Sequence, residues 1–137
     1  MKFTHHGLQI EMPDEWWTEA GMRGFVPTFT AYRVNHRLFQ NVHEVPIKYI
    51  GPVTRNSGVG IFNDSEKDGS ARERVVRILR GFRSDNAIPP VEIVDGQAGY
   101  PYRYKLVHGA HRIYCSLAAG FTCVPSIKDF ENRTGKR

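Results

Sequence analysis

The stretch LVHGAHRIYCSLAAGF (residues 106–121) predicts a strand, a glycine corner and a helix. Gly109 permits the sharp backbone turn between the two elements, and Gly120 suits the left-handed residue at which helices often end. Because the corner joins a strand to a helix, it predicts a fold in which helices pack on a sheet. Its polar residues are His108, His111 and Arg112.

The sequence on either side of this corner predicts further strands and one more helix. PPVEIV (89–94) and YRYKLV (102–107) are strand-like, and FTCVPSIKDF (121–130) predicts a last strand. Ser70 and Glu73 form a capping box at the start of a helix whose apolar face carries Val75, Ile78, Leu79 and Phe82. VHEVPIKYI (42–50) predicts the opening strand, and residues 51–69 a long loop.

From residue 42 the expected order is therefore strand, helix, strand, strand, helix, strand. This order predicts an α+β (α/β layer) fold, a small mixed sheet with helices packed on it, over residues 42–130. We expect residues 131–137 to form a tail.

Residues 1–41 predict an N-terminal elaboration that packs on the main unit, because so short a segment forms a thin core alone. KFTHHGLQIEM predicts a hairpin, and PDEWWTEAGM a short helix with acidic residues at its start and Gly21 at its end. GFVPTFTAYRV (24–34) predicts an edge strand or extended segment, because Pro27 interrupts it. The 137 residues thus form one domain.

The net charge of +5 and the cysteine content bear on partners and compartment. A moderate positive charge is compatible with an anionic ligand, either a nucleotide or a nucleic acid. Cys115 and Cys123 are expected to be reduced and buried, which fits the cytoplasm. No segment approaches the roughly 20 apolar residues that span a bilayer, so no membrane partner is expected.

The corner predicts a phosphate site. The first N–H groups of a helix have no acceptor within the helix, and the helix dipole adds positive charge there. Arg112 is poorly placed for its own helix dipole but well placed to hold a phosphate, and His111 could donate another hydrogen bond. The alternative is that Gly109 makes a turn and that His111 and Arg112 are ordinary surface residues.

Arginines on the helix over residues 70–82 form a second basic feature. If this helix lies beside the corner, Arg74 and Arg77 could reach the same anion. The alternative is a solvated face whose charges are balanced by Glu66, Asp68 and Glu73.

Neither a metal centre nor a cysteine nucleophile is expected at the corner. His108, His111 and Cys115 offer three ligand types without a fourth, which is poor for structural zinc. Neither thiol lies at a helix start or beside an evident base. Carboxylates of the long loop, Asp64, Glu66 and Asp68, could bind Mg²⁺.

Several segments together resemble the ParB/sulfiredoxin superfamily. They are Pro89-Pro90-Val91, the strand 102–107, the corner Gly109-Ala110-His111-Arg112, the helix 113–119 and Val124-Pro125-Ser126-Ile127. VPIKYI (45–50) is similar to the family's opening strand, so the resemblance covers about residues 42–130.

This resemblance implies a nucleotide-binding domain, with ATP or CTP as the nucleoside triphosphate and Mg²⁺ as a possible companion. It implies that Gly109, Ala110, His111 and Arg112 hold phosphates. Matching the apolar faces of the preceding helix adds Arg74 and Arg77, with Gly81 at a third position.

The departures from the family limit its chemistry here. Sulfiredoxins carry their catalytic cysteine where this chain has Ala110, so sulfiredoxin activity is not expected. Partitioning proteins have an acidic residue at that position and continue into a helix-turn-helix, so DNA segregation is not expected either. Kinase-like relatives often have Asp-Gly where this chain has His108-Gly109. His108 is the candidate acid or base, because it lies one residue from the expected phosphate site and an imidazole can exchange a proton near neutral pH.

The leading expectation is therefore a nucleotide-binding domain whose status as an enzyme stays open. If catalytic, it would carry out nucleotide-dependent phosphotransfer or hydrolysis, or act as a nuclease. One alternative is a ParB-like nuclease or DNA-binding module. Another is a non-catalytic regulator or toxin–antitoxin component, with residues 1–41 as the surface for a protein partner or a second copy.

Overall fold

The computed structural model describes residues 1–53 and 71–128 of the chain. Ser70 of the expected capping box and the loop carboxylates Asp64, Glu66 and Asp68 lie outside these ranges, as does the predicted tail. The elements in chain order are β1 (Lys2–His5), β2 (Leu8–Glu11), α1 (Asp14–Glu19), β3 (His43–Pro46), the 3-10 turn η1 (Ile47–Tyr49), α2 (Ala71–Arg83), β4 (Val91–Asp95), β5 (Tyr104–His108), α3 (Ala110–Ala119) and β6 (Cys123–Lys128).

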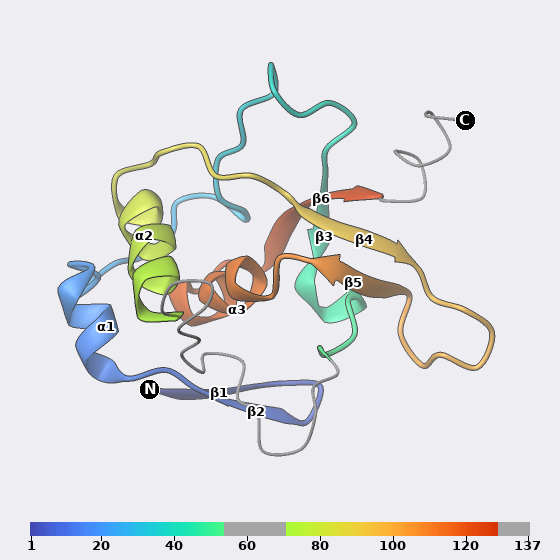
Figure 1. Ribbon diagram of the computed structural model, residues 1–137, viewed down its shortest axis with the longest axis horizontal. Coiled ribbons are helices and arrows are strands. Elements are labelled where there is room, and N and C mark those ends of the chain that lie inside the picture. The colour runs from blue at the N-terminus through green and yellow to red at the C-terminus, as the bar shows by residue number, and fades with distance from the viewer. Residues whose placement is uncertain (54–70, 129–137) are drawn as a thin grey trace.

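The main sheet is mixed and has the strand order β3-β6-β4-β5. β3 pairs antiparallel with β6, β6 parallel with β4, and β4 antiparallel with β5. In Figure 1 the three helices gather on one side of this sheet, and α3 contacts both β4 and β6. The predicted α+β fold with a small mixed sheet is therefore confirmed.

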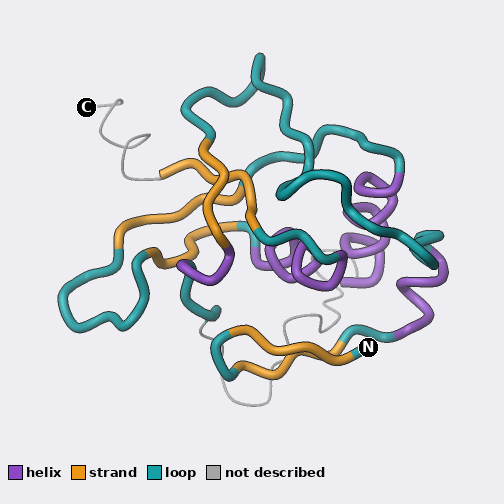
Figure 2. Tube along the Cα trace, turned by 180° about the vertical axis from the view of Figure 1, so that it is seen from behind, coloured by secondary structure: helices purple, strands orange, loops and turns teal. Residues whose placement is uncertain are grey.

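The first forty residues form the predicted hairpin and helix. β1 and β2 pair antiparallel across a turn in which His6 and Gly7 both have positive φ, 51° and 83°. Gly21, with φ of 75°, follows the end of α1. Figure 2, from behind, shows the long connection after α1 as loop that runs back toward the sheet.

Two strand predictions need correction. The strand expected over 42–50 covers only His43–Pro46, because Pro46 has φ of −56° and the Ile50 N–H bonds to the carbonyl of Ile47 to close a 3-10 turn. Residues 24–34 form no strand, so of the two forms expected for this segment the edge strand is ruled out. Single backbone hydrogen bonds hold this segment, such as the Ile88 N–H to the carbonyl of Arg33 at 2.9 Å.

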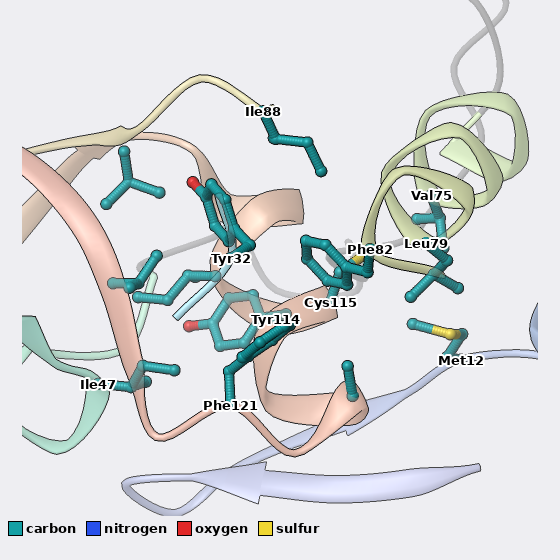
Figure 3. Packing of buried hydrophobic residues seen from close by; sticks show 14 of the residues in the cluster. Met12, Tyr32, Ile47, Val75, Leu79, Phe82, Ile88, Tyr114, Cys115 and Phe121 are labelled. Carbon is teal, nitrogen blue, oxygen red and sulfur yellow. The ribbon is translucent and has the colours of Figure 1, made fainter. Parts of the chain in front are cut away.

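One hydrophobic cluster joins the N-terminal residues to the rest of the chain. Ile10, Met12 and Trp16 belong to the same cluster as Leu79 of α2 and Tyr114 of α3. Figure 3 shows rings and aliphatic chains from these elements packed together. Each large apolar side chain fully buried here contributes about 2 kcal/mol to folding.

A buried hydrogen-bond network ties the hairpin to α3. The imidazole of His5 is buried, with Nε2 3.2 Å from the carbonyl of Ile47 and Nδ1 3.3 Å from the hydroxyl of Tyr114. A carbonyl only accepts, so Nε2 carries the proton and Nδ1 accepts from Tyr114. The Tyr114 hydroxyl in turn accepts from the Val53 N–H at 3.0 Å. Burial lowers the pKa of His5 below its ordinary value of 6.5.

Among the described residues, no helix has the length and apolar character that crossing a bilayer requires.

Candidate functional site

The start of α3 is shaped by Gly109. Its φ of 110° and ψ of 29° lie in the left-handed region. A Cβ added there would stand 2.6 Å from Cγ1 of Val91, so the side chain of β4 leaves no room for one. Glycine is therefore required here by both backbone conformation and packing.

Arg112, in the first turn of α3, braces the segment that leads into β4. Its Nη1 donates to the carbonyl of Pro90 at 2.5 Å and to that of Pro89 at 3.2 Å. Within residues 1–53 and 71–128, its Nε and Nη2 atoms have no hydrogen-bond partner. Part of the guanidinium thus has a structural role that the sequence did not predict, and part remains available for an anion.

Tyr32 contacts the same proline carbonyl from the N-terminal segment. Its hydroxyl donates to the carbonyl of Pro89 at 2.7 Å, and its ring stacks on Phe82 of α2. Burial raises the pKa of the Tyr32 phenol, partly opposed by the positive charge of Arg112. The Pro-Pro segment is therefore held from two sides by neutral and charged donors.

A groove of about 920 Å³ lies between α2 and the start of α3. Its described lining includes Arg74 and Arg77 from α2. The start of α3 contributes Gly109, Ala110, His111 and Arg112. The structure thus brings together the six residues that the sequence predicted to bind phosphate.

His108 is placed differently. It is exposed at the end of β5, opposite Glu92 in the strand register, and does not belong to the described lining of the groove. Gly81, the third position implied on α2, does line the groove, but a Cβ there would lie 2.8 Å from Ile88.

The charge of the groove is predominantly positive. Its described lining holds two glutamates, Glu19 and Glu73, against five arginines, namely Arg72, Arg74, Arg77, Arg80 and Arg112. Walls of one sign attract and concentrate ligands of the opposite charge. Guanidinium groups match the planar geometry of phosphate oxygens.

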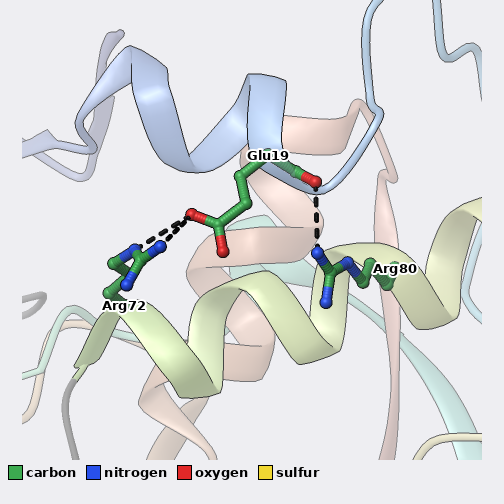
Figure 4. Close-up of polar contacts among 3 residues, drawn as sticks. All are labelled: Glu19, Arg72 and Arg80. Atoms are coloured by element: carbon green, nitrogen blue, oxygen red, sulfur yellow. Dashed lines mark hydrogen bonds and ion pairs between the residues drawn. The ribbon is translucent and has the colours of Figure 1, made fainter.

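Glu19 is a charged residue of this groove that the sequence did not predict. It lies in the last turn of α1, and its Oε1 accepts from Nε and Nη2 of Arg72 at 2.9 and 2.7 Å (Figure 4). Its backbone carbonyl accepts from Nη2 of Arg80 at 3.4 Å. The expected balance of this face by Glu66 and Asp68 falls outside the described residues, whereas Glu19 supplies a partner from another helix.

One signal in the sequence pointed to Glu19. An acidic side chain at the C-terminal end of a helix faces the negative end of the dipole. A positive partner elsewhere in the fold would offset this unfavourable position, although the sequence does not identify that partner.

The thiols do not provide a nucleophile at the groove. Cys115 is fully buried, and burial raises the pKa of its thiol. Both cysteines are reduced, but Cys123 is only half-buried, so its expected burial was wrong. Over the described ranges, no three His, Cys, Asp or Glu side chains gather into a metal-binding group.

A larger groove, of about 1370 Å³, lies elsewhere on the molecule. It runs along residues 25–37 and the end of α2, and includes the exposed side chains of Val26 and Phe29. Of the positions implied by the resemblance, its described lining includes Gly81, whereas Arg74, Arg77 and residues 108–112 are not part of it. The smaller groove is the better candidate for an anion because its arginines converge with a helix start.

The arrangement between α2 and α3 can bind a phosphorylated molecule through arginines and backbone N–H groups. Compared with protein-family models, with curated proteins and with solved structures, the chain matches none of them.

Proposed function

We propose that the protein binds a nucleotide in the groove between α2 and α3, with its phosphates at the start of α3. The main observation behind this proposal is that Arg74 and Arg77 line the same groove as Gly109–Arg112, although the two segments are far apart in the sequence. The sequence resemblance to the ParB/sulfiredoxin superfamily supports the same assignment independently.

The roles of the residues follow from their positions. The N–H groups of the first turn of α3 are oriented to donate to phosphate oxygens. Arg77 is exposed in the groove and, among the described residues, has no ion-pair partner, so its charge is available to a ligand. Arg112 contributes the atoms that its bonds to Pro89 and Pro90 leave unused.

Ala110 limits the proposal to binding. Its side chain carries no reactive group at the position where sulfiredoxins keep their cysteine, and His108 lies outside the described lining. We therefore propose that the groove binds phosphates, and we assign no residue in it as a nucleophile or a base.

A thermal-shift titration tests the proposal. ATP, CTP, GTP and ADP are added with and without Mg²⁺, and a ligand at a hundredfold excess over its Kd stabilises the fold by about 2.7 kcal/mol. Losing the charge-assisted bonds of Arg77 in Arg77→Ala should weaken binding about tenfold or more.

Arg83→Ala provides the matched control, because Arg83 is an exposed arginine of the same helix outside this groove. If no nucleotide stabilises the protein, or if Arg77→Ala binds as tightly as Arg83→Ala, the proposal fails. If instead a DNA oligonucleotide binds with steep salt dependence, the groove holds the backbone phosphates of nucleic acid.

A further inference from the structure

The contact between Glu19 and Arg72 places a carboxylate inside an arginine-lined groove. Glu19 belongs to that lining, and its Oε1 atom accepts hydrogen bonds from Nε and Nη2 of Arg72 (Figure 4). The Glu19 side chain is 33% exposed and that of Arg72 54%, so both remain accessible to ions from solvent. Such an exposed pair can be exchanged for another partner at low cost.

We propose that Glu19 is a built-in competitor that holds Arg72 and lowers the affinity of the groove for highly charged anions. This inference rests on the proposed phosphate-binding function and adds the residue that limits it. A phosphate that bonds to Nε and Nη2 of Arg72 must displace the Glu19 carboxylate, so from these two donors it gains only the difference between two charge-assisted interactions.

The geometry of α2 separates the arginines into two groups. At 3.6 residues per turn, Arg80 lies about 80° and Arg77 about 140° around the helix from Arg72. Arg72 and Arg80 both bond to Glu19, on the flank next to α1. A ligand at the α3 end of the groove therefore meets Arg77 without displacing Glu19, whereas it can bond to Nε and Nη2 of Arg72 only after displacing the carboxylate.

The effect of Glu19 depends on the charge of the ligand. Its negative charge repels an anion in proportion to the charge that the anion carries. Glu19 therefore weakens the binding of tripolyphosphate more than it weakens the binding of inorganic phosphate. Salt screens this repulsion, so the difference between the two anions decreases as ionic strength rises.

Calorimetric titration of the full chain with inorganic phosphate and with tripolyphosphate tests the inference. Glu19→Gln keeps the size of the side chain and removes its charge. We expect Glu19→Gln to bind tripolyphosphate about three- to fivefold more tightly than the unaltered protein, in line with an exposed ion pair. The gain for inorganic phosphate should be smaller, and both gains should shrink in high salt.

Glu15→Gln is the matched control, because Glu15 is an exposed glutamate of α1 outside the groove. A second comparison uses Arg72→Gln alone and combined with Glu19→Gln. If Glu19 acts by holding Arg72, the gain from Glu19→Gln is reduced in the Arg72→Gln background.

The outcomes separate the two proposals. If the unaltered protein binds tripolyphosphate and Glu19→Gln binds it no better than Glu15→Gln, this inference fails and the proposed function stands. Equal gains for the two anions also overturn it, because they would show loosened packing rather than charge competition. If neither the unaltered protein nor Glu19→Gln binds tripolyphosphate, inorganic phosphate or any nucleotide, the proposed function fails as well.

Discussion

The hydroxyl of Tyr32 and the guanidinium of Arg112 both donate hydrogen bonds to the carbonyl oxygen of Pro89, at 2.7 and 3.2 Å. One donor comes from the N-terminal segment and the other from the helix start that lines the groove. The segment before β4 is thereby fixed between two parts of the chain that the sequence separates widely. A change on the Tyr32 side is therefore expected to affect the same wall of the groove that Arg112 supports.

Tyr32→Phe tests this link. The ring keeps its stacking on Phe82, whose centroid lies 5.4 Å away, and only the bond to Pro89 is lost. We expect the free energy of unfolding to fall by about 1 kcal/mol, measured by urea denaturation. Tyr49→Phe, an exposed tyrosine, serves as the control and should leave stability unchanged. Equal effects of the two substitutions would contradict the role of the hydroxyl.

The His5 network predicts a dependence of stability on pH. The folded state lowers the pKa of His5 below 6.5, so the unfolded chain takes up the proton first as the pH falls. The stabilisation is thus fully present above pH 6.5 and is lost as the pH falls through the lowered folded-state pKa. The slope contributed by His5 reaches at most about 1.4 kcal/mol per pH unit.

Urea unfolding of His5→Gln across this pH range measures that contribution. The variant should be less stable at neutral pH, and its stability should fall less steeply in acid. His36→Gln, which changes an exposed histidine, should keep the slope of the unaltered protein. If the stability of His5→Gln falls with pH as steeply as that of His36→Gln, His5 is not the source of the pH dependence.

Gly109→Ala and Gly120→Ala separate backbone strain from steric exclusion. Both glycines have left-handed φ angles, 110° and 97°. Strain alone costs about 1–2 kcal/mol at either position. At Gly109 the added Cβ also meets Val91 at 2.6 Å, whereas at Gly120 the nearest atom, of Pro27, is 3.4 Å away. Measured by urea denaturation, Gly109→Ala should therefore lower the free energy of unfolding by about 1–3 kcal/mol more than Gly120→Ala does. Equal losses in the two variants would contradict the clash with Val91.

The two cysteines should differ in reactivity toward a thiol reagent. Cys115 is fully buried with a raised pKa, and only the thiolate reacts readily. Under native conditions we expect alkylation at the half-buried Cys123, with Cys115 modified only in denaturant. Mass spectrometry of the intact protein and its peptides gives the count and position. Native modification of Cys115 at the rate seen for Cys123 would show that its burial is not maintained in solution.

The helix α3 could be predicted from the sequence because its signals are local. Gly109 and Gly120 both adopt the left-handed conformations expected at its two ends. The α2 helix was confirmed for the same reason, through its apolar periodicity. The strand expected over 42–50 was half right, since the β-branched pattern continues past Pro46 while the backbone turns.

The contacts of the candidate site depend on residues distant in the sequence, which local patterns do not reveal. Arg112 was predicted to clamp a phosphate, but no local pattern shows that its Nη1 reaches the carbonyl of Pro90. The only signal for Glu19 in the sequence is its unfavourable position at the end of its own helix, because its partner Arg72 belongs to another element. The sequence could predict that two basic segments meet in a groove. It could not predict that the carboxylate of Glu19 lies in that groove.

The strand order β3-β6-β4-β5 has a consequence for how the chain reaches its fold. β6 is the last of the described strands, yet it lies between β3 and β4 and pairs with both. During synthesis on the ribosome, β3 therefore has no neighbouring strand to pair with until residues 123–128 have left the exit tunnel. Closing contacts of such long sequence separation slows folding, so assembly of this sheet is expected to follow, rather than accompany, elongation through most of the chain.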